Sequence, residues 1–162
     1  MQVSATIQEV TSEVEKLAET AASAHQLMLG MVELLHKRML KYNWVGFYMI
    51  SFDDPNMLVL GPYVGAMTPH TRIPLNQGIC GAAASSGTTV VVDDVSKDSR
   101  YLACSLETKS EIVAPVFVKG KVVGELDIDS HFLAAFHGED RTLVEYCAHV
   151  VGKFMEKRVA KA

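Results

Sequence analysis

Three carboxylates stand at alternate positions in the segment VVGELDIDS. Glu125, Asp127 and Asp129 would share one face of a strand, because successive side chains of a strand point to opposite faces. Leu126 and Ile128 would share the other face. One interpretation is a half-solvated strand with a wet acidic face, which such alternation favours when taken alone. The other is a group of acids lining a cavity, where burial and like charges raise their pKa values so that one carboxyl holds a proton near neutral pH.

The three cysteines are the other candidates for chemistry. Cys147 has helical spacing to apolar neighbours, which predicts a small buried core residue. Cys80 follows Gly78 at the expected start of a short helix, where the helix dipole and free N–H groups lower the pKa of a thiol. Cys104 lies in a polar loop between two expected strands, where an exposed thiol meets reaction partners. Spacing alone leaves redox chemistry and inert thiols both open, and without a CxxC pair it predicts no structural zinc site.

Composition limits the class of protein. A chain of 162 residues, 49% of them hydrophobic, fits one soluble globular domain. The net charge of -4 and the lack of a Lys/Arg stripe predict that neither nucleic acid nor an anionic membrane is a partner. No apolar run is long enough to span a membrane, and the N-terminus does not resemble a secretory signal. We therefore expect a cytoplasmic protein, and an odd number of cysteines agrees with a reducing compartment.

The chain reads as helix, sheet, helix. Apolar residues return every three or four positions between about residues 7 and 40, which predicts one or two amphipathic helices. Small residues predict a short helix over 78–87, and the pattern after residue 138 predicts a closing helix. Five apolar segments predict strands: 44–50, 57–60, 89–93, 112–118 and 121–128. Strand follows strand directly at two places, so the sheet is expected to be at least partly antiparallel.

Seven segments together resemble a known family, the free methionine-(R)-sulfoxide reductases, which are small single GAF domains. In chain order these segments are NWVGFY (43–48), LGPYVG (60–65), RIP (72–74), GICG (78–81), LAC (102–104), SEIVAP (110–115) and LDIDS (126–130). The resemblance implies an α/β (α+β) fold with a six-stranded antiparallel sheet flanked by helices and an active site roofed by loops. It also implies one GAF domain over residues 1–162, divided into N-terminal helices (1–42), sheet and active-site loops (43–136) and a C-terminal helix (137–162).

The same resemblance implies an activity, the reduction of free methionine (R)-sulfoxide without a metal or organic cofactor. Residue by residue, it gives Cys104 the role of nucleophile, Cys80 that of resolving cysteine, Glu111, Asp127 and Asp129 the acidic substrate pocket, and Trp44 and Tyr48 the aromatic wall. An acid group answers a chemical need, because the sulfoxide oxygen must be protonated as it leaves, and a carboxyl kept neutral by its neighbours can do this. A dithiol of the thioredoxin type is the expected reductant.

Two positions depart from the family pattern. His70 stands where the family commonly has a further cysteine, so Cys80 is left as the expected internal partner of Cys104. We expect His70 to be a solvated polar residue without a catalytic role. Glu125 stands where the family usually has an apolar residue, and we expect it to be a wet edge residue outside the site.

Two other functions remain open. The chain could be a GAF module that binds a small ligand and does no chemistry, or a structural dimerisation domain that uses its long N-terminal helix. The coincidence of both thiols with the acid pair favours the enzyme. GAF domains often pair through their terminal helices, so we also expect a homodimer.

Overall fold

A six-stranded sheet organises the molecule. The computed structural model describes residues 5–102 and 106–160. The strands are β1 (Trp44–Ile50), β2 (Met57–Val64), β3 (Arg72–Pro74), β4 (Val90–Val92), β5 (Ser110–Val118) and β6 (Lys121–Ser130). They lie in the order β3-β2-β1-β6-β5-β4, and every neighbouring pair is antiparallel. The expected six-stranded antiparallel sheet flanked by helices is confirmed.

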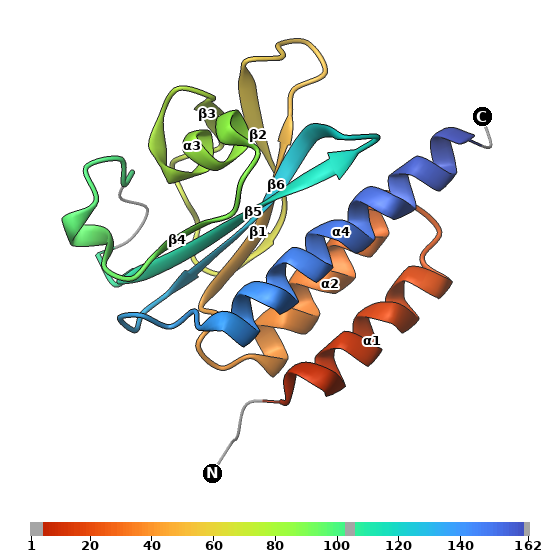
Figure 1. The fold of residues 1–162 in the computed structure, drawn as a ribbon, viewed down its shortest axis with the longest axis horizontal. Helices are drawn as coiled ribbons and strands as arrows, with labels where there is room; N and C mark the ends of the chain where they lie inside the picture. The colour runs from red at the N-terminus through yellow and green to blue at the C-terminus, as the bar shows by residue number, and fades with distance from the viewer. Residues whose placement is uncertain (1–4, 103–105, 161–162) are drawn as a thin grey trace.

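The helices divide between the two faces of this sheet. They are α1 (Ile7–Thr20), α2 (Ala24–Arg38), α3 (Gly78–Ser86) and α4 (Gly138–Ala160), with a short 3-10 helix η1 (Val95–Lys97). Figure 1 shows α1, α2 and α4 side by side on one face and the shorter α3 on the other. None of the helices within residues 5–102 and 106–160 has the length and apolar character needed to cross a bilayer.

Side-chain caps fix where the N-terminal helices begin. The Thr6 hydroxyl accepts the Glu9 N–H at 3.1 Å, and the Glu9 carboxylate accepts the Thr6 N–H at 3.4 Å. This reciprocal pair satisfies two of the N–H groups that a helix start leaves free. Ser23 caps α2 by accepting the Gln26 N–H at 3.1 Å. The predicted amphipathic region is therefore two helices, separated where Ala21–Ser23 leave the helical path.

The face covered by α1, α2 and α4 is an apolar core. Leu126 and Ile128 of β6 are fully buried there together with Phe47 and Leu35. Cys147 of α4 belongs to the same cluster and has no exposed surface, which confirms the prediction of a core residue. Burial raises the pKa of its thiol to about 12. This thiol therefore stays protonated and unreactive at neutral pH.

The face covered by α3 depends on close backbone packing. Gly78 begins the helix with φ +72°, a left-handed conformation that favours glycine. A Cβ on Gly81 would lie 2.8 Å from the carbonyl oxygen of Leu75, so only glycine lets α3 pack against that loop. The small residues over 78–87 thus form the predicted tightly packed helix.

Two short elements were not anticipated, and some strands are longer than predicted. β2 continues to Val64 and β6 to Ser130, while β3 and η1 had no prediction. Three-residue elements carry too little pattern to be seen in a sequence, and β3 exists only because β2 provides hydrogen-bond partners for it. Lys119 and Gly120 form a tight turn between β5 and β6, and both have positive φ (51° and 78°).

Candidate active site

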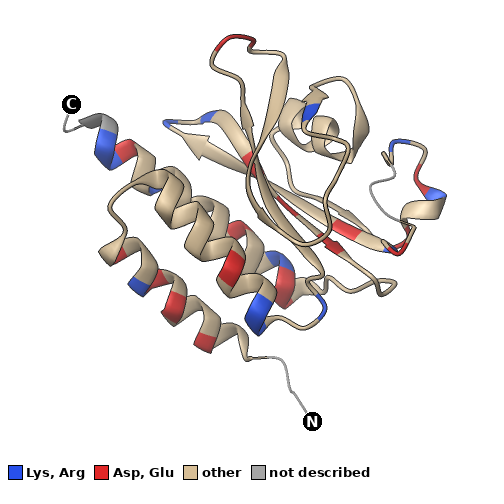
Figure 2. Ribbon diagram, turned by 180° about the vertical axis from the view of Figure 1, so that it is seen from behind, with Lys and Arg blue, Asp and Glu red and all other residues tan. Residues whose placement is uncertain are grey.

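Strand register gathers the acids on the face of the sheet that α3 covers. Asp129 of β6 lies opposite Glu111 of β5 and opposite Trp44 of β1, and Asp127 lies opposite Gly46. All three acids therefore share one face, and they are only 3–5% exposed. Figure 2 shows such acidic positions on the central strands as well as on the outer helices and loops. A wet acidic strand is thereby excluded, because these carboxyls are buried.

Two aromatic side chains lie beside the acids. The Trp44 and Tyr48 rings are stacked, with centroids 6.2 Å apart. Trp44 Nε1 donates to the carbonyl of Ala66 at 3.0 Å, and the Tyr48 hydroxyl donates to the carbonyl of His70 at 2.7 Å. Gly46 between them leaves room for the indole, since a Cβ there would lie 2.7 Å from Trp44 Cζ3. The structure thus holds both rings in fixed positions on the same face as the acids.

A small cavity of about 20 Å³ lies among the thiol, the acids and the aromatic rings. Its lining residues are Tyr48, His70, Ile73, Gly78, Ile79, Cys80, Leu102, Glu111 and Asp127. This space is enough for about one water molecule. Four of the residues predicted for the site therefore meet at one cavity, while Trp44 and Asp129 lie next to them on the same face.

Cys80 is the third residue of α3 and faces the acids. Its Sγ donates to Asp127 Oδ2 at 3.4 Å, and the residue is 5% exposed. The expectation of a lowered thiol pKa was wrong. Burial raises the pKa of Cys80 well above its ordinary value, and the charges of Asp127, Glu125 and Glu111 raise it further. Removal from water and neighbouring carboxylates outweigh the partial positive charge of a helix start.

Burial is the first cause of the raised pKa at each of the three predicted acids. For Glu111 the charges of Asp127 and Asp129 raise the pKa further, and for Asp129 the charge of Asp127 does so. The pKa of Asp127 is raised less strongly, because hydrogen bonds to Glu111 and Cys80 favour its ionised form. Asp127 is thus the acid that ionises most readily, and Glu111 and Asp129 keep their protons to higher pH than free carboxyls.

Glu125 corrects the sequence analysis. It was set aside as a wet edge residue, but it has no exposed surface at all. β6 lies inside the sheet between β1 and β5, so its acids are covered from both sides as well as by α3. Burial raises the pKa of Glu125 well above its ordinary value. The alternation of VVGELDIDS placed Glu125 on one face with Asp127 and Asp129, and the structure shows that all three are buried.

Cys80, Glu111 and Asp127 are also a possible set of metal ligands. One ligand atom from each lies within 4.8 Å of the other two. A bound metal would take the cysteine as thiolate, so it would have to displace the proton that the thiol shares with Asp127 and that burial retains. This arrangement suits proton transfer better than cation binding, and we assign no metal site. The expectation of chemistry without a cofactor stays a prediction.

Cys104 and His70 complete the account of the residues considered from the sequence. Cys104, the predicted nucleophile, lies outside the described residues. His70 lines the cavity and accepts the Tyr48 hydrogen bond through its backbone carbonyl, so the contact described does not depend on its imidazole.

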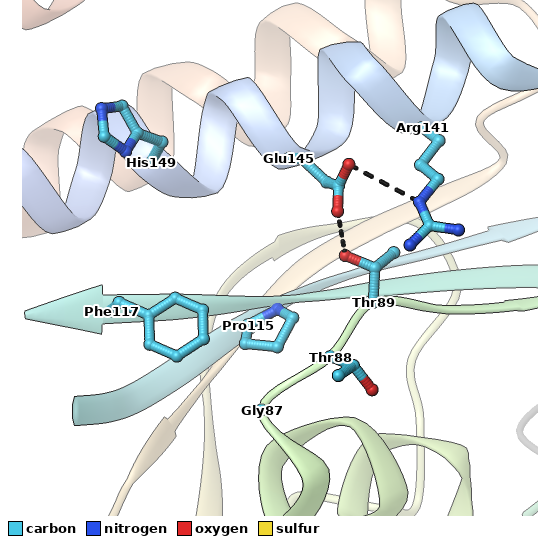
Figure 3. Close-up of a pocket in the computed structure, with 8 residues that line it drawn as sticks. All are labelled: Gly87, Thr88, Thr89, Pro115, Phe117, Arg141, Glu145 and His149. Atoms are coloured by element: carbon cyan, nitrogen blue, oxygen red, sulfur yellow. Dashed lines mark hydrogen bonds and ion pairs between the residues drawn. The ribbon is translucent and has the colours of Figure 1, made fainter. Parts of the chain in front are cut away.

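A larger cleft of about 380 Å³ lies elsewhere, between α4 and the ends of β4 and β5 (Figure 3). Its lining residues are Gly87, Thr88, Thr89, Pro115, Phe117, Arg141, Glu145 and His149. The Thr89 hydroxyl donates to Glu145 Oε2 at 2.6 Å, and Arg141 Nε lies 3.5 Å from Glu145 Oε1. These polar groups are paired with one another, and its lining set contains neither a thiol nor a group of acids. The smaller cavity is therefore the better candidate for chemistry.

Comparison with known proteins agrees with this geometry. Residues 5–154 match the GAF domain family. The free methionine-R-sulfoxide reductase of Saccharomyces cerevisiae is 39% identical over 112 residues, 68% of this chain and 62% of that protein. The free methionine-R-sulfoxide reductase of Escherichia coli is 39% identical over 107 residues, 66% of this chain and 62% of that protein. The match thus spans less than two thirds of the length of these curated relatives.

Among solved structures, the free methionine-R-sulfoxide reductase of Neisseria meningitidis in complex with its substrate superposes with a TM-score of 0.89. It is 33% identical, and the match covers 99% of this chain and 98% of that chain. The chain belongs to the GAF domain family and, within it, to the free methionine-R-sulfoxide reductases.

Proposed function

We propose that this protein reduces free L-methionine (R)-sulfoxide to methionine by thiol chemistry. The observation that carries the proposal is the meeting of the Cys80 thiol with buried carboxyls of raised pKa at one cavity beside two stacked aromatic rings. Relatives that carry this activity in their names support it.

In the first step, the Cys104 thiolate attacks the sulfoxide sulfur. The sulfur–oxygen bond breaks, and one carboxyl of the group Glu111, Asp127 and Asp129 gives its proton to the oxygen. The protonated oxygen passes from the substrate sulfur to the Cys104 sulfur, and the transient bond between the two sulfurs breaks. Methionine leaves, and Cys104 is left as a sulfenic acid. Sulfur of the substrate is reduced and sulfur of Cys104 is oxidised, so the electrons balance. Glu111 and Asp129 suit the donor's role, because both hold protons to unusually high pH.

Binding requires both ends of a free amino acid. We assign the ammonium group of the substrate to the carboxylates and its apolar side chain to the wall formed by Trp44 and Tyr48. The cavity of about 20 Å³ must widen to admit this ligand. A blocked amine would leave buried acids without a partner, which costs about 1–3 kcal/mol for each group. The proposed site therefore excludes methionine sulfoxide inside a peptide.

In the second step, Cys80 condenses with the sulfenic acid, a disulfide forms and water leaves. A dithiol of the thioredoxin type then reduces the disulfide by exchange. We further propose that the protein works in the cytoplasm as a homodimer. Sedimentation at several protein concentrations tests the dimer, and turnover with thioredoxin and its reductase in place of a chemical dithiol tests the reductant.

The deciding experiment uses racemic free methionine sulfoxide and a dithiol. We expect methionine to form and the (S) enantiomer to remain, while an acetylated, amide-capped substrate is not consumed. Equal turnover of the capped substrate would refute the proposed site. Tight binding of the free sulfoxide without any methionine formed would favour the ligand-sensing module instead.

A further inference from the structure

The segment LGPYVG (60–65) belongs to the family resemblance, but the reaction described above gives it no role. It lies in β2 and contains a β-bulge. From Gly46 to Tyr48, β1 advances two residues. The residues of β2 that face these two, Tyr63 and Leu60, are three apart. β2 therefore has one residue more than β1 at this point, and bulges beside functional sites commonly re-aim a side chain.

The bulge turns the side chain of Tyr63 toward α3. In a regular strand, residues three apart point to opposite faces, so Tyr63 would point away from the face of Leu60. Both side chains nevertheless pack against the cluster on the face that α3 covers. Val64, the next residue, packs against the apolar core on the other face. One extra residue thus brings a tyrosine to the face that carries the acids.

Tyr63 contacts Trp44 on this face. The two rings are stacked, with centroids 5.6 Å apart and an angle of 21° between their planes. A Cβ on Gly46, the residue opposite Tyr63, would lie 2.9 Å from Tyr63 Cβ and would also collide with the indole. A Cβ on Gly65 would lie 2.6 Å from Trp44 Cδ1. These two glycines therefore leave the space in which the indole lies against the tyrosine ring.

The contact with Tyr63 completes the set of contacts that hold Trp44. The indole also donates its N–H to the carbonyl of Ala66 and stacks on Tyr48, which lines the cavity. Tyr63 itself is half-buried and lies outside the set of residues that line the cavity. Its ring can therefore act on a bound molecule only through Trp44.

We propose that Tyr63 is the positioning residue of the aromatic wall, because its ring fixes the Trp44 indole in the orientation that receives the apolar side chain of the substrate. The inference rests on the proposed function for the identity of that substrate. A wall that is ordered before the ligand arrives spares the ligand the cost of ordering it. Leucine in place of Tyr63 would keep apolar contact but would lose the stacking preference of two aromatic rings.

The expected kinetic effect follows from the part of the substrate that the wall contacts. The wall is assigned to the apolar part of the substrate and not to proton transfer. Its contact is then made equally in the bound substrate and in the transition state, so loosening it should raise KM and leave kcat unchanged.

A first experiment follows Trp44 without using the proposed activity. Trp44 is the one tryptophan of the chain, so tryptophan fluorescence reports on this indole alone. The residue is 8% exposed, which shields it from acrylamide in the parent. We expect the acrylamide quenching constant to rise about threefold in Tyr63→Leu, with a fast phase in the anisotropy decay. Tyr63→Phe keeps the ring and should match the parent in both measurements.

Tyr146→Leu is the matched control. Tyr146 is also a half-buried tyrosine, but it lies in α4 on the other side of the sheet and bonds to Glu15. Its replacement should leave the fluorescence of Trp44 unchanged. Thermal unfolding shows whether each variant folds, and if Tyr63→Leu does not, Tyr63→Ile takes its place, since a β-branched side chain suits a strand. Parental quenching in a folded leucine variant, or equal loosening in Tyr63→Phe or Tyr146→Leu, would overturn the inference.

A second experiment joins the inference to the reaction. With free methionine sulfoxide and a dithiol, Tyr63→Leu should raise KM roughly fivefold and leave kcat within about twofold of the parent. Tyr63→Phe should match the parent in both constants. An unchanged KM in a variant whose indole is loosened, or a fall in kcat alone, would overturn the inference.

The two proposals fail separately. If the parent forms no methionine, the proposed function fails. Titration of Trp44 fluorescence with the same sulfoxide then measures a dissociation constant in place of KM, and Tyr63→Leu should raise it by the same factor. If the parent forms methionine and the leucine variant has parental KM, only the role of Tyr63 fails.

Discussion

The two faces of β6 carry opposite kinds of side chain, apolar on one and acidic on the other. Toward α2 and α4 the strand presents Leu126 and Ile128, which are fully buried among apolar side chains. Toward α3 it presents Glu125, Asp127 and Asp129, which are almost as deeply buried. The difference therefore does not lie in exposure to solvent. It lies in the side chains that fill each face. The α2 and α4 side is an apolar cluster that contains no acid and includes the inert thiol of Cys147, whereas the α3 side places the Cys80 thiol in hydrogen-bonding contact with an acid.

The comparison shows that burial serves two purposes in this molecule. On the helix-covered face it contributes stability, at about 25 cal/mol for each Å² of apolar surface removed from water. On the other face it alters acidity, because it holds the pKa values of Glu111, Asp129 and Glu125 well above their ordinary range. The second face is expected to decrease stability, which the first must offset.

Moving an acid to the apolar face is the largest disruption we expect. Leu126→Asp places a carboxyl among the apolar side chains of the cluster beside α2 and α4, which contains no acid. We expect a loss of roughly 4 kcal/mol or more, enough to unfold the domain. Urea unfolding followed by circular dichroism measures it.

Two control variants show whether the loss of stability in Leu126→Asp comes from the buried charge. Leu126→Met should cost less than about 1.5 kcal/mol, since it conserves volume. Glu125→Leu, the opposite exchange one residue earlier, should leave the protein folded. A folded Leu126→Asp protein of parental stability would show that the two faces are not different environments.

Replacing an acid of this face by its amide should have the next largest effect, on turnover. Glu111→Gln and Asp129→Asn keep shape but lose the proton that the sulfoxide oxygen needs, so turnover should fall on the order of a hundredfold. Steady-state methionine production measures it. Glu139→Gln, in the exposed first turn of α4, is the matched control and should leave methionine production at the parental rate. Parental rates in both site variants would contradict the assignment of the proton donor to this group.

The acidic face should also make stability depend on pH. Below the ordinary carboxyl pKa, Glu125 is protonated in both the folded and the unfolded chain, and its contribution is fully present. Above it the unfolded chain releases the proton first, because burial raises the folded pKa. The free energy of unfolding should then fall by about 1.4 kcal/mol per pH unit for this acid, up to the folded pKa.

Comparison with Glu125→Gln isolates this dependence, because acids on other elements, such as Asp94 and Glu156, contribute equally to both proteins. Urea unfolding at pH 5, 6 and 7 should show the parent losing stability relative to the variant as pH rises. Parallel curves would mean that Glu125 titrates in the folded protein as it does in water.

The smallest effect concerns the thiols, one on each side of the sheet. Cys147→Ala should lower the free energy of unfolding by about 1 kcal/mol, as for the loss of one buried heavy atom, and leave turnover unchanged. Cys80→Ser should instead release about one methionine per chain and then stall with Cys104 oxidised. Mass spectrometry after one turnover distinguishes these outcomes. A Cys104–Cys147 bridge would assign the resolving role to the other side of the sheet.

The pattern of the chain was enough to anticipate most of the fold. Helical periodicity located α1, α2 and α4, and apolar segments located the long strands, because these signals extend over many residues. β3 and η1 were not anticipated, since three residues carry no period and gain their structure from partners elsewhere in the chain. The role of each predicted site residue, including Cys104 outside the described residues, stays a prediction.

What the sequence determined by itself is which side chains share a face. The period of two in a strand put Glu125, Asp127 and Asp129 together before any contact was known. Only the tertiary structure decided whether that face is wet or dry, because exposure depends on what packs above the strand. β1, β5 and α3 enclose these acids, and so Glu125 is a buried acid and not a wet one. The acidity of the Cys80 thiol was likewise decided by neighbours 31 to 47 positions away in the chain, Glu111 and Asp127, which local spacing cannot reveal.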